Sequence, residues 1–477
     1  MKNSDAFNPA EENVAPHDMS WTTQTILFAN GYILSLVQFG YSVYFVTKSL
    51  SGNETTAGGI VATLSLLGSL LFFFVMVRWS SLLGLSYFGF KRHRTRSEEP
   101  AHFPYVSIFV PCYNEGETIS LALESLLELN YPAYEVLVVN DGSTDDTLEK
   151  AKKFEGVYGG VTVRVLDKPN GGKWSAHNLA FHRSSGELIM CVDADTRFEP
   201  NALRRMVVHF EEDPKIAIIA GQTRVRNQDR LIGKMQNLEY QIYNGVIRLS
   251  QNVSGCVLCV PGPLGLFRRT AMEEVCYRFA RNTDVSKPGR YLGPFESDTF
   301  SEDFDLSSAI LSLSYKVVYE PHAIAYTNVP PTLFTLINQR YRWYRGNLQV
   351  IRKLFKRATG DPVTAPPRMW LWTCVTYFID ISLVPIFMVM APVFYILVLI
   401  QLTTISTAGY ETFFVGWIVA VLAMGLSLST LFLTLHREKI RFNNVIMVIL
   451  FDWYSWILIA AGIISIVDEI RDKKMKW

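Results

Sequence analysis

The 477-residue sequence has little cysteine and no surplus of either charge. Its 45 Lys and Arg residues and 44 Asp and Glu residues give a formal net charge of +1, which argues against nucleic acid as a partner because phosphate-backbone binding needs a basic surplus. Of its six cysteines, only Cys256 and Cys259 have C-x-x-C spacing, and no second pair or nearby histidine completes a zinc site. We interpret them as reduced, packed thiols.

The N-terminus lacks the basic region of a secretory signal peptide. Residues 1–20 are polar and net acidic, so we expect a flexible tail there. Hydrophobic residues make up 49% of the chain and are concentrated in long runs. The first two runs, Trp21–Thr47 and Ala57–Phe88, are each long enough to cross about 30 Å of hydrocarbon. We expect two transmembrane helices within residues 21–90. The basic cluster that follows, Lys91–Arg96, is typical of the cytoplasmic side, so the next domain should be cytosolic.

Apolar runs resume after the central region, at Met369–Leu402, Thr412–Leu435 and Val445–Ile466. They predict about three transmembrane helices within residues 369–468, followed by a charged tail at 469–477. A cytosolic basic loop at His436–Arg441 would place the Arg471–Lys476 cluster outside, against the positive-inside rule. One of these runs is therefore interfacial, re-entrant or doubled.

Between Tyr105 and Tyr326, β-rich runs alternate with amphipathic segments, which predicts an α/β domain with a largely parallel sheet. The expected strands are Val106–Pro111, Glu135–Asn140, Val161–Asp167, Glu187–Val192, Ile216–Ala220 and Lys316–Glu320. The expected helices are Gly116–Leu129, Asp145–Phe154, Lys173–Arg183, Asn201–Phe210 and Leu231–Leu249. Ligands of such sheets bind beyond the carboxyl ends of the strands.

Two polar motifs follow the first two strands, Val110–Glu115 (VPCYNE) and Val139–Asp145 (VNDGSTD). An acidic residue at a strand end can bind a base or ribose, and glycine permits close approach. The alternative is a turn with a helix N-cap.

A D-x-D motif, Asp193 and Asp195, ends another apolar strand. Two such carboxylates can hold Mg²⁺ or Mn²⁺ together with a diphosphate. Most D-x-D sequences are structural, but the position at a strand end favours a metal site here.

Two further motifs are SEDFDLS, beginning at Ser301, and QRYRW, beginning at Gln339. A carboxylate at the start of a helix suits a general base, although capping is the structural alternative. Arg can bind phosphate and Trp can stack on a sugar, although the same residues are typical of a membrane-interface belt.

The ordered set PCYNE, VNDGSTDD, NGGKWSA, VDADT, GPLGLFRR, SEDFDLS and QRYRW resembles that of the processive family 2 glycosyltransferases, which include cellulose, poly-N-acetylglucosamine, chitin and hyaluronan synthases. The resemblance implies a Rossmann-like GT-A domain at residues 104–330, an amphipathic interface helix and linker at 331–368, and flanking transmembrane helices. The chain departs from the family pattern in two ways. Ser301 stands where many relatives have Thr. Val253–Arg269 resembles hyaluronan synthases more closely, whereas SEDFDLS and QRYRW resemble poly-N-acetylglucosamine and cellulose synthases.

The resemblance also implies roles for single residues. Asp303 would be the catalytic base with Glu302 beside it, and Asp193 and Asp195 would contact the nucleotide-sugar and its metal. The remaining substrate-binding residues would be Tyr113, Glu115 and Asp141 around base and ribose, Lys173 near the nucleotide, and Gln339, Arg342 and Trp343 of Q-x-x-R-W at the diphosphate and acceptor sugar.

The implied function is an inverting, membrane-bound polysaccharide synthase in the plasma (inner) membrane, with its catalytic domain in the cytosol. Its partners would be a UDP-sugar, first UDP-N-acetylglucosamine, the growing polysaccharide, membrane lipid and possible accessory or export subunits. The alternatives are a hyaluronan- or glucan-type synthase, a non-processive transferase acting on a lipid carrier, and an inactive transporter or scaffold.

Overall fold

The computed structural model describes residues 40, 74, 77–79, 81–89, 99–279, 286–360, 366–383 and 445–473. The chain divides into two compact units. One consists of Met1–Tyr87 and Cys374–Ile459, and the other of Phe88–Thr373 and Ala460–Trp477. Every predicted site residue belongs to the second unit, which we call the catalytic unit.

Much of the predicted membrane region lies outside the described residues, including Thr412–Leu435 and nearly all of Trp21–Thr47. Where the later runs are described, they form α12 (Pro367–Thr373), the π-helix η3 (Cys374–Leu383) and α15 (Val445–Ile470). Within the described part of the chain, no helix combines the length and the apolar character that a bilayer crossing requires.

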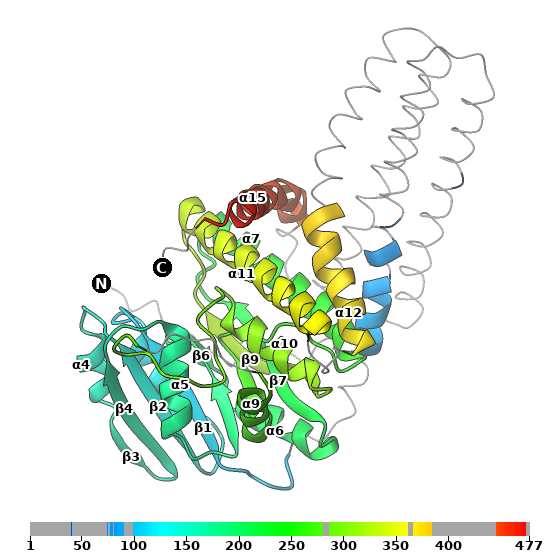
Figure 1. The fold of residues 1–477 in the computed structure, drawn as a ribbon. Coiled ribbons are helices and arrows are strands. Elements are labelled where there is room, and N and C mark those ends of the chain that lie inside the picture. The colour runs from blue at the N-terminus through cyan, green and yellow to red at the C-terminus, as the bar shows by residue number, and fades with distance from the viewer. Residues whose placement is uncertain are drawn as a thin grey trace, which may run out of the picture. The chain divides into compact units, whose positions relative to one another are not determined.

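The catalytic unit is built on a mixed sheet with the strand order β3-β4-β2-β1-β5-β8-β7-β9-β6 (Figure 1). The six predicted strands are all present, as β1 (Val106–Cys112), β2 (Tyr134–Asp141), β4 (Val161–Lys168), β5 (Leu188–Cys191), β7 (Ile216–Val225) and β9 (Lys316–Thr327). Strands β4, β2, β1 and β5 are mutually parallel, as are β7 and β9.

The expectation of a largely parallel sheet needs correction because three short strands add antiparallel pairs. These are β3 (Gly156–Tyr158), β6 (Arg197–Phe198) and β8 (Gly265–Arg268). β8 lies between β5 and β7 and is antiparallel to both, so it joins the two parallel blocks. Such short runs carry too little periodicity to be recognised as strands in the sequence.

Helices cover both faces of the sheet. Side chains alternate along β1, so Ile108 packs in one core with Ile119 of α3 (Ile119–Leu127) and Met206 of α6 (Ala202–Glu212). Phe109 points to the other face, where its ring lies 6.4 Å from that of His177 in α5 (Lys173–Arg183). Strands β1 and β2 are buried on both faces, as their continuous apolar runs predict.

The remaining helices of the catalytic unit follow the sheet connections. They are α4 (Thr147–Lys152), α7 (Leu231–Ile242), the π-helix η2 (Tyr243–Arg248), α8 (Leu249–Asn252), α9 (Arg269–Arg278), α10 (Glu302–Ser312) and α11 (Leu333–Gly360). The long helix predicted over Leu231–Leu249 is therefore interrupted by η2. Helix α9 has no counterpart in the sequence prediction.

Candidate active site

Three loops that carry predicted site residues leave the same edge of the sheet. In the parallel pairs β1–β2 and β1–β5, Cys112 lies opposite Asn140 and Phe109 lies opposite Cys191. Because parallel strands end at one edge, the segments that follow them meet beyond their carboxyl ends. These segments carry Tyr113, Glu115, Asp193 and Asp195, and Asp141 is the last residue of β2 at the same edge.

The loops after β1 and β2 are tied together by Asn114, which has a left-handed backbone with φ 55°. Its backbone N–H donates to Ser143 Oγ over 3.0 Å, and its Oδ1 accepts the Thr144 N–H over 2.8 Å. Asp145 Oδ1 accepts the Thr147 N–H at 3.1 Å. This hydrogen bond is typical of a turn, which is the alternative interpretation of the VNDGSTD motif. The loop geometry thus explains part of the motif without a ligand.

Tyr113 and Glu115 flank Asn114 in this loop and differ in exposure. Tyr113 is 49% exposed, so its ring can stack on a base. Glu115 is half-buried, and its Oε2 accepts a hydrogen bond from Thr118 Oγ1 at 2.7 Å. Burial raises the pKa of Glu115, and the charges of Asp195 and Asp193 raise it further. The first loop and the D-x-D motif therefore share one electrostatic environment.

Asp141 is buried and organises the loop that precedes α5. Its carboxylate forms an ion pair with Lys168 and accepts the N–H groups of Gly171 and Gly172, each over 2.9 Å. Gly142 has φ +71°, and a Cβ there would lie 2.7 Å from the Asn170 nitrogen. The structure thus gives Asp141 an anchoring contact with the NGGK loop, while its predicted contact with base or ribose stays a prediction.

Lys173 connects the D-x-D motif with the acids of α10. Its Nζ lies 2.6 Å from Asp193 Oδ1 and 3.4 Å from Glu302 Oε1. A Cβ at Gly262 would lie 3.0 Å from Lys173 Nζ and 3.5 Å from Asp193 Oδ2, so this glycine lets the segment after α8 cover the pair closely. Residues more than a hundred positions apart in the sequence thus form one acidic site around a single lysine.

The D-x-D carboxylates fit a divalent cation. Thr196 and Thr327 both donate to Asp195 Oδ1, at 3.1 and 3.3 Å, while Lys173 occupies Asp193 Oδ1. No described residue donates a hydrogen bond to the Oδ2 atom of either aspartate, so one oxygen of each is available as a ligand. Burial and the charge of Asp193 raise the pKa of Asp195, and a cation between them would relieve this repulsion.

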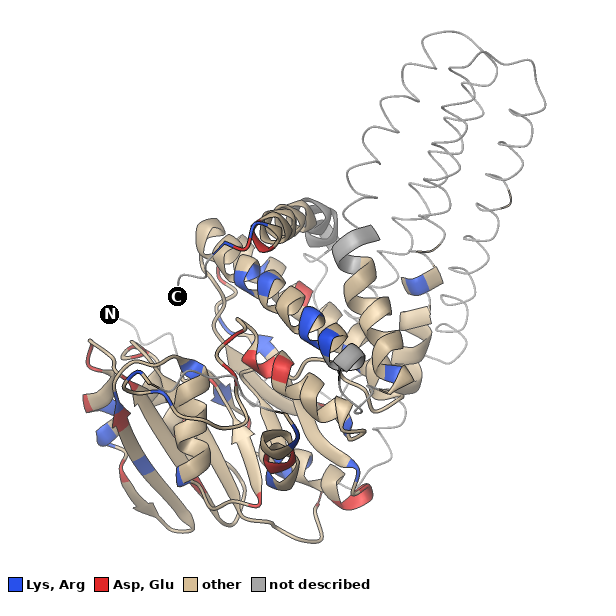
Figure 2. Ribbon diagram, in the orientation of Figure 1, with Lys and Arg blue, Asp and Glu red and all other residues tan. Residues whose placement is uncertain are grey.

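Asp303 and Glu302 begin α10, whose first turn is acidic (Figure 2). Asp303 is half-buried, and its Oδ1 accepts the Phe304 N–H over 2.7 Å. Burial is the main cause that raises the pKa of Asp303 to about 7, the negative charge of Glu302 raises it further, and Lys173 opposes the shift. A carboxyl group that titrates near neutral pH suits a general base.

This environment predicts the pH dependence of turnover. A base must be deprotonated, so we expect the rate at saturating donor to fall as pH falls through about 7, by about tenfold per pH unit below it. Glu302→Gln removes a negative charge and should lower the pKa of Asp303, moving the acidic limb to lower pH. Lys173→Met removes a positive charge and should move that limb to higher pH. Identical limbs in the wild-type enzyme and both variants, in rate profiles from pH 5.5 to 9, would mean that another group titrates.

The QRYRW motif lies in the first half of α11, along which Lys and Arg recur (Figure 2). Arg342 and Trp343 are exposed, Trp343 to 39%. The guanidinium of Arg340 lies 4.2 Å from the centre of the Trp343 ring, and it also pairs with Glu239 of α7 over 2.6 Å. The Arg340 guanidinium therefore covers one face of the Trp343 indole.

Three residues of this region carry contacts that the sequence interpretation did not assign. Gly262 covers the Lys173–Asp193 pair, Thr327 binds Asp195 from β9, and Arg340 fixes Trp343. Arg340 lies inside the Q-x-x-R-W motif at a position that the pattern leaves open, and Gly262 is the first residue of GPLGLFRR, whereas Thr327 belongs to no recognised motif. The motif gives no role for Gly262, and the contact from Thr327 depends on the sheet topology and leaves no local signal.

Comparisons with known proteins identify a family for this chain. The model of the glycosyltransferase like family 2 matches residues 104–346, slightly more than half of the 477-residue chain. The chain is 27% identical over 415 residues to the poly-β-1,6-N-acetyl-D-glucosamine synthase of Staphylococcus epidermidis, covering 86% of this chain and 92% of the relative. It is 32% identical over 294 residues to the synthase of the same name from Staphylococcus aureus, covering 60% and 66%.

Among solved structures, the chain resembles a mannosyltransferase from Pyrobaculum calidifontis in complex with GDP-mannose and Mn²⁺. The TM-score is 0.57 at 19% identity, covering 86% of this chain and 100% of the other. This likeness confirms the predicted α/β fold of GT-A type. Because the family model spans the whole sheet and the segments that hold the acidic site, this chain belongs to glycosyltransferase family 2 and is an enzyme whose curated relatives are polysaccharide synthases.

Proposed function

We propose that this enzyme polymerises N-acetylglucosamine from UDP-N-acetylglucosamine into a β-linked polysaccharide at a membrane. The observation that carries the proposal is the similarity to a poly-β-1,6-N-acetyl-D-glucosamine synthase over 92% of that relative's length, which extends well beyond the catalytic domain. The site supports the same conclusion because it combines a neutral-range base with a pair of carboxylates suited to a metal–diphosphate complex.

The reaction is a direct displacement at the anomeric carbon. An acceptor hydroxyl oxygen forms a bond to that carbon while the bond to the donor phosphate breaks, and the electron pair leaves with the nucleoside diphosphate. Asp303 accepts the proton of the hydroxyl, and the raised pKa of its carboxyl matches this task. Lys173 and Arg342 contribute positive charge toward the departing diphosphate. Tyr113, Glu115 and Asp141 bind the base and ribose.

Asp193 and Asp195 would hold Mg²⁺ or Mn²⁺ through the oxygens that carry no hydrogen bond in the described structure. When bound, the cation supplies positive charge that stabilises the leaving diphosphate. The Mn²⁺ in the structure of the Pyrobaculum mannosyltransferase supports this assignment.

Gln339, Arg342 and Trp343 would close over the donor diphosphate and the acceptor sugar. Trp343 is suited to stacking on a sugar because one side of the indole is held by Arg340 while more than a third of the side chain is exposed. An aromatic platform beside the base would hold the terminal sugar of the growing chain for the next transfer.

Membrane attachment is supported by the long apolar runs that flank the catalytic domain. The C-terminal end of α15 packs on α11. Ser465 and Asp468 form hydrogen bonds with Tyr341, and Glu469 pairs with Arg345. This packing supports a position of the basic C-terminal tail on the same side as the catalytic unit. In our proposal that side is the cytosol, the run Val445–Ile466 is interfacial, and the positive-inside rule is obeyed.

The proposal is tested by offering the purified full-length enzyme each UDP- and GDP-sugar separately and measuring nucleotide release and product size. We expect polymer from UDP-N-acetylglucosamine and little release from the other donors. A variant with Asp303→Asn serves as the control for contaminating activity.

Each alternative has its own outcome in this assay. Polymer from UDP-glucose, or only from a mixture of two donors, would replace the proposed substrate with a glucan- or hyaluronan-type product. A single glycolipid band would show a non-processive transferase. Absence of nucleotide release with every donor would favour an inactive scaffold.

A further inference from the structure

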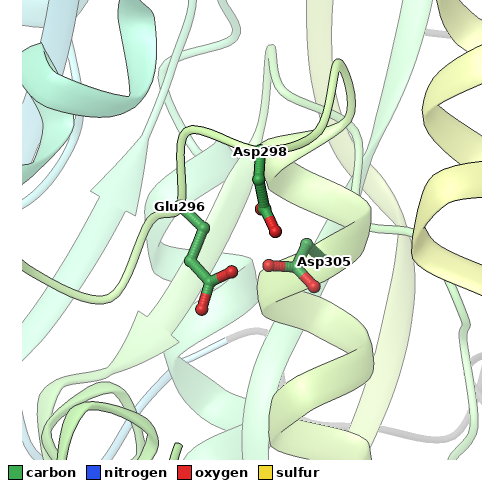
Figure 3. A group of neighbouring side chains, drawn as sticks. All are labelled: Glu296, Asp298 and Asp305. Carbon is green, nitrogen blue, oxygen red and sulfur yellow. The ribbon is translucent and has the colours of Figure 1, made fainter. Parts of the chain in front are cut away.

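A second acidic cluster lies beside the base-bearing helix. Glu296 and Asp298 belong to the loop before α10, and Asp305 belongs to α10 itself (Figure 3). One oxygen of each carboxylate lies within 4.8 Å of the others. Glu296 and Asp305 are buried, so three negative charges at this spacing need a cation to offset their repulsion.

The cation is provided by Lys353 of α11. Its Nζ lies 2.7 Å from Glu296 Oε2 and 3.2 Å from Asp305 Oδ2, and it also pairs with Asp298. Its side chain is only 17% exposed. Because the ammonium group occupies the centre that the three carboxylates share, the cluster is an ion-pair network and not a metal site.

Lys353 is the last of three residues on one face of α11 that contact the segment leading into α10. Gly346, Gln349 and Lys353 are three and four residues apart and lie on one side of the helix. A Cβ at Gly346 would overlap Ser301 Oγ, and Gln349 Oε1 accepts the Phe300 N–H over 3.2 Å. The helix is therefore held to this segment over about two turns.

These contacts connect two parts of the reaction site. Helix α11 carries Arg342 and Trp343 one to three turns before the residues that contact this segment. The segment itself leads directly into Glu302 and Asp303 at the start of α10. The helix is stiff over such a distance, so its rotation and axial position relative to α10 set where the indole lies relative to the base. Of the three contacts, only that of Lys353 is an ion pair enclosed by carboxylates from both the loop and α10.

We propose that Lys353 is a positioning residue that fixes the Q-x-x-R-W helix against the base-bearing segment, so that the acceptor sugar is aligned with Asp303. The inference rests on the proposed transfer to a sugar acceptor. In this proposal Lys353 itself does not contact the substrate. Loss of Lys353 should therefore affect transfer to the acceptor more than donor binding or donor hydrolysis, which needs no aligned sugar.

The test compares Lys353→Met with Lys353→Arg, and with Lys356→Met as the matched control at an exposed lysine on the same helix. Polymer yield, donor hydrolysis, donor KM and melting temperature are measured on the full-length enzyme. Misplacing a reacting group by about 1 Å costs about 100-fold in rate, and we expect Lys353→Met to lower transfer by about 10- to 100-fold with donor KM changed less than about threefold. Lys353→Arg keeps the charge and should recover part of the loss, while Lys356→Met should match the wild-type enzyme.

Two results would overturn the inference. Equal losses of transfer and hydrolysis in Lys353→Met, together with a lower melting temperature, would mean that Lys353 only stabilises the fold. Unchanged transfer would mean that Lys353 does not position the acceptor. If Lys353→Met does not fold, Gln349→Met weakens the same contact face more mildly and should lower the ratio of transfer to hydrolysis in the same direction. An inactive wild-type enzyme would refute the proposed function instead, so the two failures are distinguishable.

Discussion

Replacement of Asp303 by Asn should lower the rate of sugar transfer on the order of 10²-fold or more while leaving donor affinity nearly unchanged. The amide keeps the shape of the carboxyl group but cannot accept the proton of the acceptor hydroxyl. The surrounding contacts favour this outcome because Asp303 makes its one side-chain hydrogen bond in the described structure to the adjacent Phe304 N–H. Initial rates at saturating donor and a separate measurement of UDP binding would distinguish the two quantities.

The control is Asp229→Asn, the same chemical change at an exposed position just before α7. It should behave like the wild-type enzyme. Near-normal turnover of Asp303→Asn, or a defect found mainly in nucleotide binding, would show that Asp303 has a structural role. In that case Glu302 would be the next candidate, because its carboxylate lies 3.4 Å from Lys173 in the same site.

Removal of divalent metal should abolish turnover, and Mg²⁺ or Mn²⁺ added in excess of the chelator should restore it. The leaving diphosphate otherwise lacks its main counter-charge, and Lys173 alone cannot replace the metal because its charge is shared with Asp193 and Glu302. The measurement is nucleotide release in EDTA, followed by titration with each metal. Full activity in the presence of chelator would contradict the metal assignment.

The paired substitution is Asp195→Asn, which keeps the size of the side chain and its hydrogen bonds from Thr196 and Thr327 largely possible. We expect it to raise the Mn²⁺ concentration needed for half-maximal activity and to lower the maximal rate by about 100-fold or more. A variant with normal metal dependence and a lower melting temperature would instead indicate that Asp195 serves to fix β9 through Thr327.

Local sequence patterns predicted the parallel core of the fold well. Helix α5 has the predicted bounds Lys173–Arg183, because the two glycines before it and the Ser184–Gly186 segment after it mark its ends. Strand β1 was predicted within one residue, since its continuous apolar run is flanked by polar segments. The acidic start of α10 followed from a similar local signal.

Strand β9 shows where local patterns are insufficient. The sequence predicted its end at Glu320, before Pro321, because proline cannot donate a ladder hydrogen bond. The structure continues the strand to Thr327, with an irregularity: Glu320 pairs with Gly221, and the next pair joins Ile324 to Gln222. The extra residues bulge out and the ladder resumes, which depends on a partner strand about a hundred residues away.

The amino-acid sequence predicted the class of fold and the position of most motifs at a strand end or helix start, and it indicated candidates for a base and for a metal-binding carboxylate pair. These features depend on periodicity, glycine and acidic residues over a few neighbouring positions. The pairing of the charged side chains is visible in the folded chain alone. Lys173 reaches both Asp193 and Glu302, Asp141 is buried against the NGGK loop, and Lys353 joins α11 to the segment before the base. Such pairings depend on strand order and helix packing, because they join residues too far apart in the chain for any local pattern to relate them.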